Sequence, residues 1–168
     1  GAHEILARGL QMVNYAWIKR ISPTVLTKIY VEAVGAKDEM DLMEGLSNET
    51  YHLFPYIVLQ IVDAARAGDY AAREILKWAG EELGMLAVSV ARQIEMENDE
   101  VEVIQSGSVF NAGELITGSM KATVLTHCPK AKLIRLEGPP VVGAVILGME
   151  QAGFDGYAVR DAMVRSAK

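Results

Sequence analysis

The sequence predicts a helix-rich α/β domain with one βαβ unit near its C-terminal end. Apolar residues recur every three or four positions through most of residues 4–94, which is the spacing of one face of a helix. Two short segments rich in Val, Ile and Leu, 101–105 and 132–136, follow only after that, and a helical segment over about 112–127 separates them. Strands joined in this way are parallel, with a right-handed crossover.

The first two helices are predicted by their apolar spacing and their end signals. One helix is expected from Glu4 to Lys19 because its apolar residues form a single stripe. For the next helix, Ser22 is expected as the N-cap and Pro23 at the first helical position, where its missing N–H costs little. Gly35 is the expected C-terminal stop.

A short helix and a long helical hairpin follow. Asp38 and Gly45 are expected to bracket the short helix. The first helix of the hairpin is expected to start at Pro55 and to end at Gly68. Asp69 then caps the second helix, which the spacing extends to about residue 94.

Small residues within two helices predict close packing. Gly80 and Gly84 lie inside the second hairpin helix, where each costs about 1 kcal/mol relative to alanine, so both are interpreted as sites of close helix packing. Gly143, Ala144 and Gly148 lie at similar spacing on the last long helix. This second pattern predicts tight packing of that helix on the sheet.

The predicted sheet is incomplete. A helix after the Pro139–Pro140 loop and a short amphipathic helix over 155–168 end the sequence, so only two strands are predicted. Two parallel strands leave two unpaired edges and too little buried face. Either strands in the first half have been missed or their partners lie in a part of the protein absent from this sequence, and we favour the second explanation.

Composition limits the classes of function. The 168 residues suit one domain, 1–168, with a helical part at 4–94 and a βαβα part at 101–153. The formal net charge of −6 argues against a nucleic-acid or anionic-membrane surface. Cys128 is the only cysteine, so neither a disulfide framework nor a thiolate metal site is expected. With no signal-peptide pattern and no run of 18 apolar residues, a cytoplasmic location is expected.

The segment "VEVIQSGSVF" forms a strand-to-helix corner, where ligands bind in open α/β sheets. Gly107 has no Cβ, so a flat adenosine group could approach its backbone, and Ser108 could cap the following helix or turn its hydroxyl toward a ribose or phosphate. Any tight strand-to-helix turn also needs a glycine and a capping serine, so the residues alone leave a structural role and a ligand site both open.

No catalytic or metal-binding constellation accompanies this corner in the sequence. The three histidines, His3, His52 and His127, lack the spacing of a zinc site. No serine elbow, Cys–His pair or close carboxylate pair at helical spacing stands out either. We therefore expect neither catalytic residues nor metal ligands within these 168 residues.

Three motifs together resemble a known family. They are "AxxGDxxAxxIL" at Ala65–Leu76, "GSVF" at Gly107–Phe110 and "PxxGA" at Pro140–Ala144. The order and content of these motifs resemble the C-terminal lobe of the BadF/BadG/BcrA/BcrD ATPase family, which includes N-acetylglucosamine kinases and belongs to the actin-like ATPases of RNase H-like fold. The resemblance runs over essentially the whole chain and implies one lobe of a two-lobed protein.

The resemblance also implies where ATP is held. In that family the "GSVF" turn is the adenosine motif, and the start of the hairpin helix lies beside the adenine. The residues expected to bind ATP are therefore Gly107, Ser108, Val109, Phe110, Asn111 and Pro55. The chain departs from the family in having Ser106 where a second glycine is usual and Pro55 where alanine is common. Asn111 and Pro55 are also ordinary helix-start residues.

The resemblance implies an ATP- and Mg²⁺-dependent kinase that acts on an amino sugar or another small molecule. The missing N-terminal lobe would supply the first phosphate loop and the catalytic carboxylate, so the 168 residues alone are expected to be inactive. A homodimer is compatible with the resemblance. One alternative is the ATPase activator of a 2-hydroxyacyl-CoA dehydratase or benzoyl-CoA reductase, although its iron–sulfur cluster needs paired cysteines. A non-catalytic helical interaction domain is the other.

Overall fold

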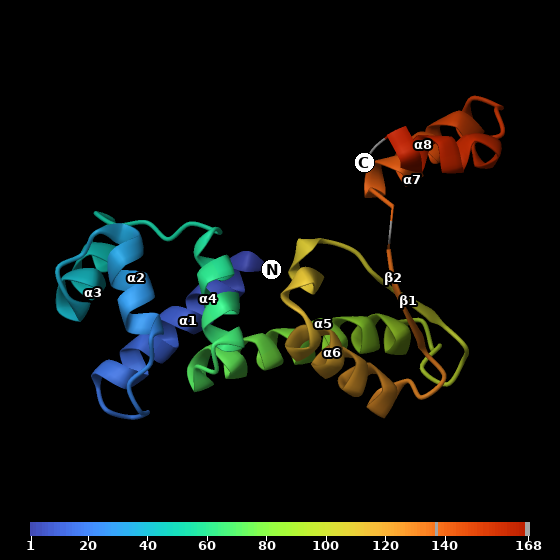
Figure 1. Cartoon of the computed structure of the whole chain (residues 1–168). Coiled ribbons are helices and arrows are strands. Elements are labelled where there is room, and N and C mark those ends of the chain that lie inside the picture. Colours follow the sequence, from blue (N-terminus) through green and yellow to red (C-terminus); the bar gives the residue numbers. More distant parts are fainter. Residues whose placement is uncertain (137, 167–168) are drawn as a thin grey trace.

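The computed structural model describes residues 1–136 and 138–166 and is built mainly of helices (Figure 1). The two strands of a parallel sheet come before and after the sixth α-helix in chain order, and two short 3-10 helices complete the elements. The predicted helix-rich architecture with a βαβ unit is therefore confirmed. The elements are α1 (Ala2–Trp17), α2 (Leu26–Val34), α3 (Glu39–Ser47), α4 (Ile57–Arg66), α5 (Tyr70–Gln93), β1 (Glu102–Gln105), η1 (Ser108–Ala112), α6 (Glu114–His127), β2 (Lys132–Arg135), α7 (Pro140–Gln151), η2 (Tyr157–Val159) and α8 (Arg160–Ser166).

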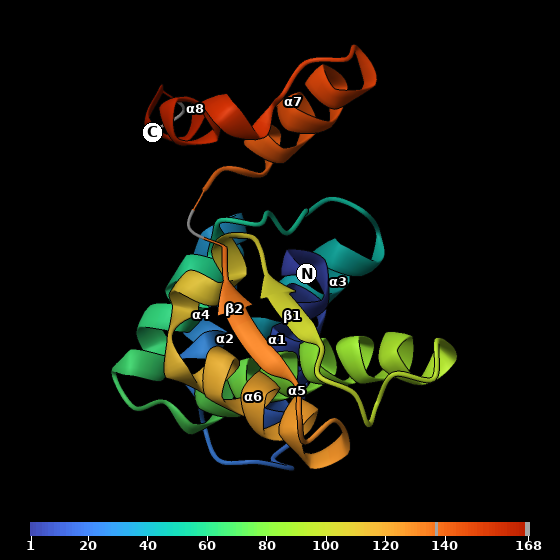
Figure 2. The ribbon, with the colours of Figure 1, turned by 90° about the vertical axis from the view of Figure 1, so that its right-hand side faces the viewer.

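The sheet is covered by helices on one face only. Strands β1 and β2 pair in register from Glu102 opposite Lys132 to Gln105 opposite Arg135. The inward side chains Val103 and Leu133 pack against the core. The two strands run beside α5 and α6 (Figure 2). Because side chains alternate along a strand, the other face carries Ile104, Ile134 and Leu136, which are all exposed. Among the residues that the structure describes, no third strand joins either edge.

The core gathers around α5, the longest helix, which packs against α6, α4 and α1. Its fully buried side chains include Ile5, Val13, Tyr30, Ile61, Ile75, Val88, Ile116 and Val124. Gly80 and Gly84 face α6 at close range. A Cβ at Gly80 would overlap the Ile116 carbonyl oxygen, and one at Gly84 would lie 2.7 Å from the Thr123 Cβ. The predicted role of these two glycines in close helix packing is confirmed.

Asp69 joins two parts of the helical region. Its side chain accepts a hydrogen bond from the Ala72 N–H at 2.9 Å, which is the predicted N-cap of α5. The same carboxylate accepts from the Thr24 hydroxyl at 2.8 and 2.9 Å and from the Val25 N–H at 3.0 Å. One side chain thus fixes the starts of both α2 and α5.

The starts of α2 and α4 differ from the prediction. Helix α2 begins at Leu26, so the expected start with Ser22 as N-cap and Pro23 at the first position is wrong. The Thr24 hydroxyl, held by Asp69, instead accepts from the Leu26 N–H, and this long-range contact sets the start of the helix. Helix α4 likewise begins at Ile57, two residues after the expected Pro55.

Gly45 does not end α3, which continues to Ser47. A Cβ at Gly45 would overlap the ring of Tyr51, so this glycine makes room for an aromatic side chain. The other expected end signals are confirmed: the Asp38 side chain accepts from the Asp41 N–H, and Gly35 follows α2 in the left-handed conformation at φ +71°.

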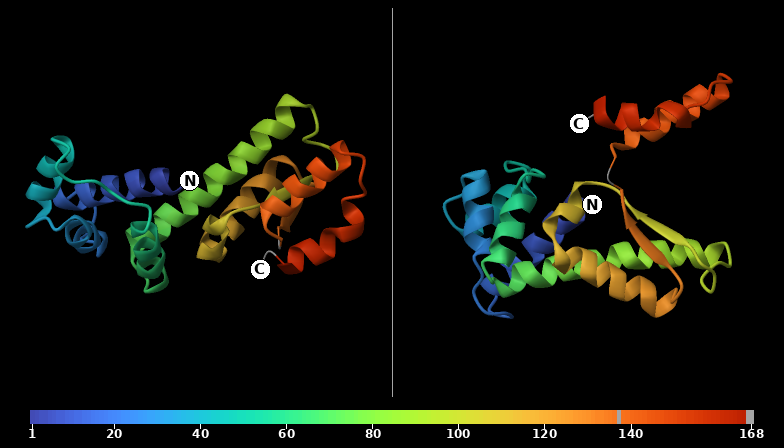
Figure 3. Two further views of the ribbon diagram at one scale, coloured as in Figure 1. Left: turned by 90° about the horizontal axis from the view of Figure 1, so that it is seen from above. Right: turned by 45° about the vertical axis from the view of Figure 1, so that its right-hand side comes forward.

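The C-terminal hairpin of α7, η2 and α8 stands away from the rest of the chain (Figures 1 and 3). The predicted packing of Gly143, Ala144 and Gly148 on the sheet is wrong, because a Cβ at either glycine would meet no atom within 4 Å and Ala144 is exposed. The hairpin packs on itself instead: Gly156 lies against the backbone of Ile146, whose side chain is buried. Small-residue spacing permits a close approach but does not select a partner. Residues 167 and 168 of the predicted last helix lie outside the described residues.

No helix within residues 1–136 and 138–166 is both long enough and apolar enough to span a membrane.

Candidate functional site

The strand-to-helix corner opens onto free space. Gly107, directly before η1, has φ +113° and ψ 160°, a conformation that L side chains rarely adopt, which accounts for glycine at this position. A Cβ built there would meet no atom within 4 Å. The turn therefore needs a glycine for its own geometry, and its backbone is also accessible to a ligand.

A cavity of about 530 Å³ lies between α4 and this corner. Four of the six residues expected to bind a ligand line it: Pro55 on the α4 side, and Ser108, Val109 and Asn111 on the η1 side. These two groups are more than 50 positions apart in the sequence, and the fold brings them together. The volume is in the usual range for small-molecule sites, roughly 300–1,000 Å³.

The cavity wall is mainly apolar with a few polar groups. Val58, Leu59 and Val62 of α4 form one side. Ile5 and Ile116, both fully buried, connect the cavity to the core. Polar atoms come from four further lining residues, Asp63, Arg66, Ser108 and Asn111. An apolar slot with a few directed polar groups suits a flat heterocycle with a polar substituent.

Gly107 and Phe110 are not among the residues that line the cavity. The Phe110 side chain is buried, and the guanidinium of Arg135 lies over its ring, 5.3 Å from the ring centroid. The buried Phe110 side chain thus anchors η1 to the core, and Gly107 lies at the bend directly before η1.

Arg135, the last residue of β2, holds the corner in place. One of its nitrogens donates to the carbonyl oxygens of Gln105 at 3.1 Å and of Gly107 at 3.0 Å, and the other donates to the Asn111 side-chain oxygen at 2.9 Å. No role for Arg135 was predicted from the sequence. The parallel pairing of the two strands, which places Arg135 opposite Gln105, was the available signal.

Ser108 does not cap a helix. The N-cap positions of η1 and α6 are Gly107 and Gly113, and neither position shows a side-chain cap. The expected helix cap at Ser108 is therefore wrong, because a 3-10 turn separates the corner from α6. The residue is exposed and lines the cavity, which leaves its hydroxyl available to a ligand.

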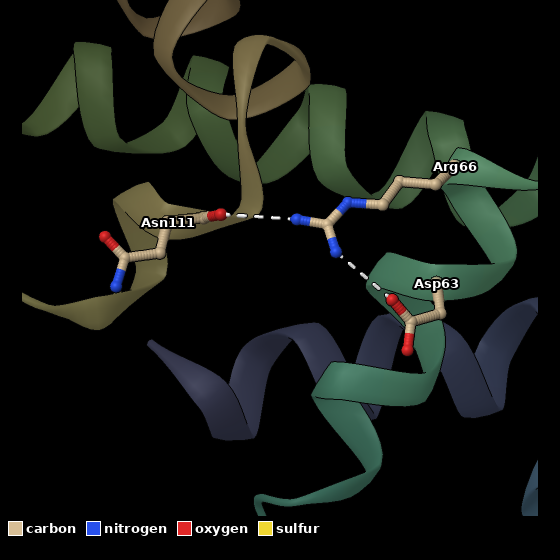
Figure 4. Close-up of polar contacts among 3 residues, drawn as sticks. All are labelled: Asp63, Arg66 and Asn111. Carbon is tan, nitrogen blue, oxygen red and sulfur yellow. Dashed lines mark hydrogen bonds and ion pairs between the residues drawn. The ribbon is translucent and has the colours of Figure 1, made fainter.

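Asp63 and Arg66 of α4 also line the cavity. The Arg66 side chain extends from beside Asp63 toward Asn111 (Figure 4). The guanidinium of Arg66 donates to the Asp63 carboxylate at 3.2 Å and, across the gap to η1, to the Asn111 carbonyl oxygen at 3.5 Å. Neither residue was singled out from the sequence. Their spacing of three positions on a helix beside the "GD" motif was a usable signal.

Other chemically active groups do not gather near this cavity. In the described parts of the chain, no three His, Cys, Asp or Glu side chains are placed to hold a metal ion. The Cys128 thiol is buried. A separate cavity of about 610 Å³ is lined by Trp17, Lys28 and Lys37, but none of the expected ligand residues lies there.

No protein-family model and no curated protein sequence matches this chain.

Proposed function

We propose that this chain is the ATP-binding C-terminal lobe of a sugar kinase with an actin-like, RNase H-like fold, similar to N-acetylglucosamine kinases. One observation carries the proposal: the 530 Å³ cavity brings Pro55 together with Ser108, Val109 and Asn111 beside the carboxyl end of a parallel strand. Ligands of open α/β sheets bind at such strand ends.

The chemistry of the cavity suits adenosine. Its apolar side chains offer flat contact area to an adenine ring, and burying that ring removes apolar surface from water. The Ser108 hydroxyl can donate to or accept from a ribose hydroxyl. Because no atom lies where the Gly107 Cβ would be, the sugar or a phosphate can approach the backbone there. In this proposal the chain binds and orients the nucleotide.

The chemical step would require groups from outside this chain. In phosphoryl transfer, protein groups chiefly position the reactants and stabilise the charge of the transferred group. Within the described residues, no three His, Cys, Asp or Glu side chains are placed to hold a metal ion by themselves, and we derive no step through Mg²⁺. We therefore expect the 168 residues alone to show sugar-kinase turnover no higher than background.

The open sheet is consistent with a lobe that packs against a further part of a protein. Ile104, Ile134 and Leu136 are exposed side by side on the uncovered face. An apolar patch of this kind is typical of a surface that another element covers.

The proposal is tested by filling the cavity. Val109 is half-buried in its wall, so Val109→Trp should block the adenosine position. Leu147→Trp on the distant α7, where the side chain is exposed, is the matched control. In calorimetric titrations with ATP and with amino sugars, Val109→Trp should weaken ATP binding at least tenfold, and the control should leave it unchanged. Equal ATP affinity of a folded Val109→Trp variant would refute the proposal.

A second candidate, a non-catalytic interaction domain, is favoured by α7, where Val141, Val145 and Leu147 are exposed on a helix that stands apart. Self-association without any ATP binding would support it. No observation favours the ATPase activator of a dehydratase or reductase, whose iron–sulfur cluster needs paired cysteines, because Cys128 is buried and is the single cysteine of the sequence.

A further inference from the structure

Arg66 has a special position in the cavity between α4 and η1. Among the described residues that line this cavity, it is the one cation, and Asp63 is the one anion. The two side chains form an ion pair at 3.2 Å on a wall that is mainly apolar. The proposed function assigns no role to either residue.

Both polar contacts of the Arg66 guanidinium are made by N–H groups at the edge of its plane. One nitrogen donates to Asp63 on the same helix at 3.2 Å, and the other reaches the Asn111 carbonyl oxygen on η1 at 3.5 Å (Figure 4). All donors of a guanidinium lie in its plane, so hydrogen bonds occupy the edges and leave the two flat faces free. A planar cation of this kind stacks well on an aromatic ring.

We propose that Arg66 positions the base of the bound nucleotide by stacking its guanidinium plane on the ring. This inference rests on the proposed function and specifies which part of the nucleotide the residue contacts. The stacked ring would lie between Arg66 and the apolar side chains of α4, with Val109 opposite.

The surroundings favour a base over a phosphate as the partner of Arg66. A phosphate next to this guanidinium would also lie close to the Asp63 carboxylate and the Asn111 carbonyl oxygen, both of which repel an anion. A neutral heterocycle meets no such repulsion. Val62 and Ala112, which also line the cavity, offer a phosphate no side-chain hydrogen-bond donor.

The experiment compares ligands with and without a base. Adenosine, ATP and inorganic tripolyphosphate are titrated into the wild-type chain, Arg66→Ala, Arg66→Lys and the control Arg73→Ala, whose exposed side chain belongs to α5 outside this cavity. Arg66→Ala should weaken adenosine and ATP binding about fivefold to tenfold. Arg66→Lys should restore little of this loss, because an ammonium keeps the charge but has no plane. Binding of tripolyphosphate should not change in any variant.

The other possible outcomes distinguish failure of the stacking role from failure of the proposed function. If Arg66→Lys binds adenosine as the wild type does, or if tripolyphosphate loses as much affinity as adenosine in Arg66→Ala, the residue acts through its charge and the stacking role is overturned. Unchanged adenosine affinity in a folded Arg66→Ala variant overturns the inference while the proposed function stands. If the wild-type chain binds neither adenosine nor ATP, the proposed function fails and the inference fails with it.

Discussion

Helices α5 and α7 carry the same spacing of small residues, but only α5 uses it for packing. Gly80 and Gly84 on α5 meet the backbone and side chains of α6. Ala144 and Gly148 on α7 are exposed, and a Cβ at Gly148 would meet open space. The difference shows that small residues at this spacing allow another element to pack closely on the helix, but that the neighbouring elements determine whether such packing occurs.

The two regions also differ in how they are tied to the rest of the chain. In the body, residues 1–136, side chains join elements that are far apart in the sequence, as Asp69 does with Thr24 and Arg135 does with Gly107. In the α7–α8 hairpin the close contacts are local, such as Gly156 against Ile146. Substitutions in the body should therefore affect global stability, and those in the hairpin should not.

The largest effect is expected for Gly80→Ala. The new Cβ would overlap the Ile116 carbonyl oxygen, which belongs to the backbone of α6 and cannot move without shifting that helix. We expect the free energy of unfolding to fall by about 3 kcal/mol. Urea denaturation followed by circular dichroism measures it. A loss below about 0.5 kcal/mol would show that α5 and α6 are not in close contact.

Asp69→Ala should have the next largest effect. It removes the α5 N-cap and leaves the Thr24 hydroxyl and the Val25 N–H without this acceptor. The expected loss of stability is about 2 kcal/mol. Asp38→Ala is the matched control, because its side chain caps α3, and its loss should stay near 1 kcal/mol. Equal losses in the two variants would contradict the linking role of Asp69.

Arg135→Met tests the corner itself. Methionine replaces the unbranched hydrocarbon stem of Arg135 but has no guanidinium, so the hydrogen bonds to Gln105, Gly107 and Asn111 are lost. Because these bonds are exposed or only partly buried, the global loss should be about 1 kcal/mol or less. Hydrogen exchange of the amides of residues 105–112 should nevertheless become faster. Unchanged exchange there would mean that Arg135 does not hold the turn.

The smallest effect, with the opposite sign, is expected for Gly148→Ala. Alanine is the better helix former by up to about 1 kcal/mol, and no neighbouring atom opposes the new methyl group. The helix signals of residues 140–151 in nuclear magnetic resonance spectra should strengthen while the unfolding of the body stays the same. Destabilisation as large as that of Gly80→Ala would show that α7 packs in solution, and the contrast between the two helices would be lost.

The sequence predicted the features that depend on local chemistry. Asp69 as a cap, Gly35 as a stop and the βαβ unit all follow from a few neighbouring residues. The features it missed depend on contacts outside the element itself. The start of α2 depends on Asp69, Gly45 accommodates Tyr51 of the following loop, and α7 packs within its own hairpin instead of on the sheet.

The site shows the same division between local and long-range features. The corner at Gly107 was predictable because a strand, a glycine and a helix follow one another there. The contacts of Arg66 and Arg135 with Asn111 were not, because each residue reaches Asn111 from a different element. Their positions follow only once the hairpin helices and the sheet are packed together.

The central claim is that an adenine nucleotide binds between α4 and η1, and nuclear magnetic resonance titration of the isotope-labelled chain with ATP tests it most directly. We predict saturable shifts of backbone amides in residues 58–66 and 107–112, with no change around Trp17 and Lys28, which line a separate cavity of about 610 Å³. Saturable shifts centred on Trp17 and Lys28, or no shift at millimolar ATP, would contradict the claim.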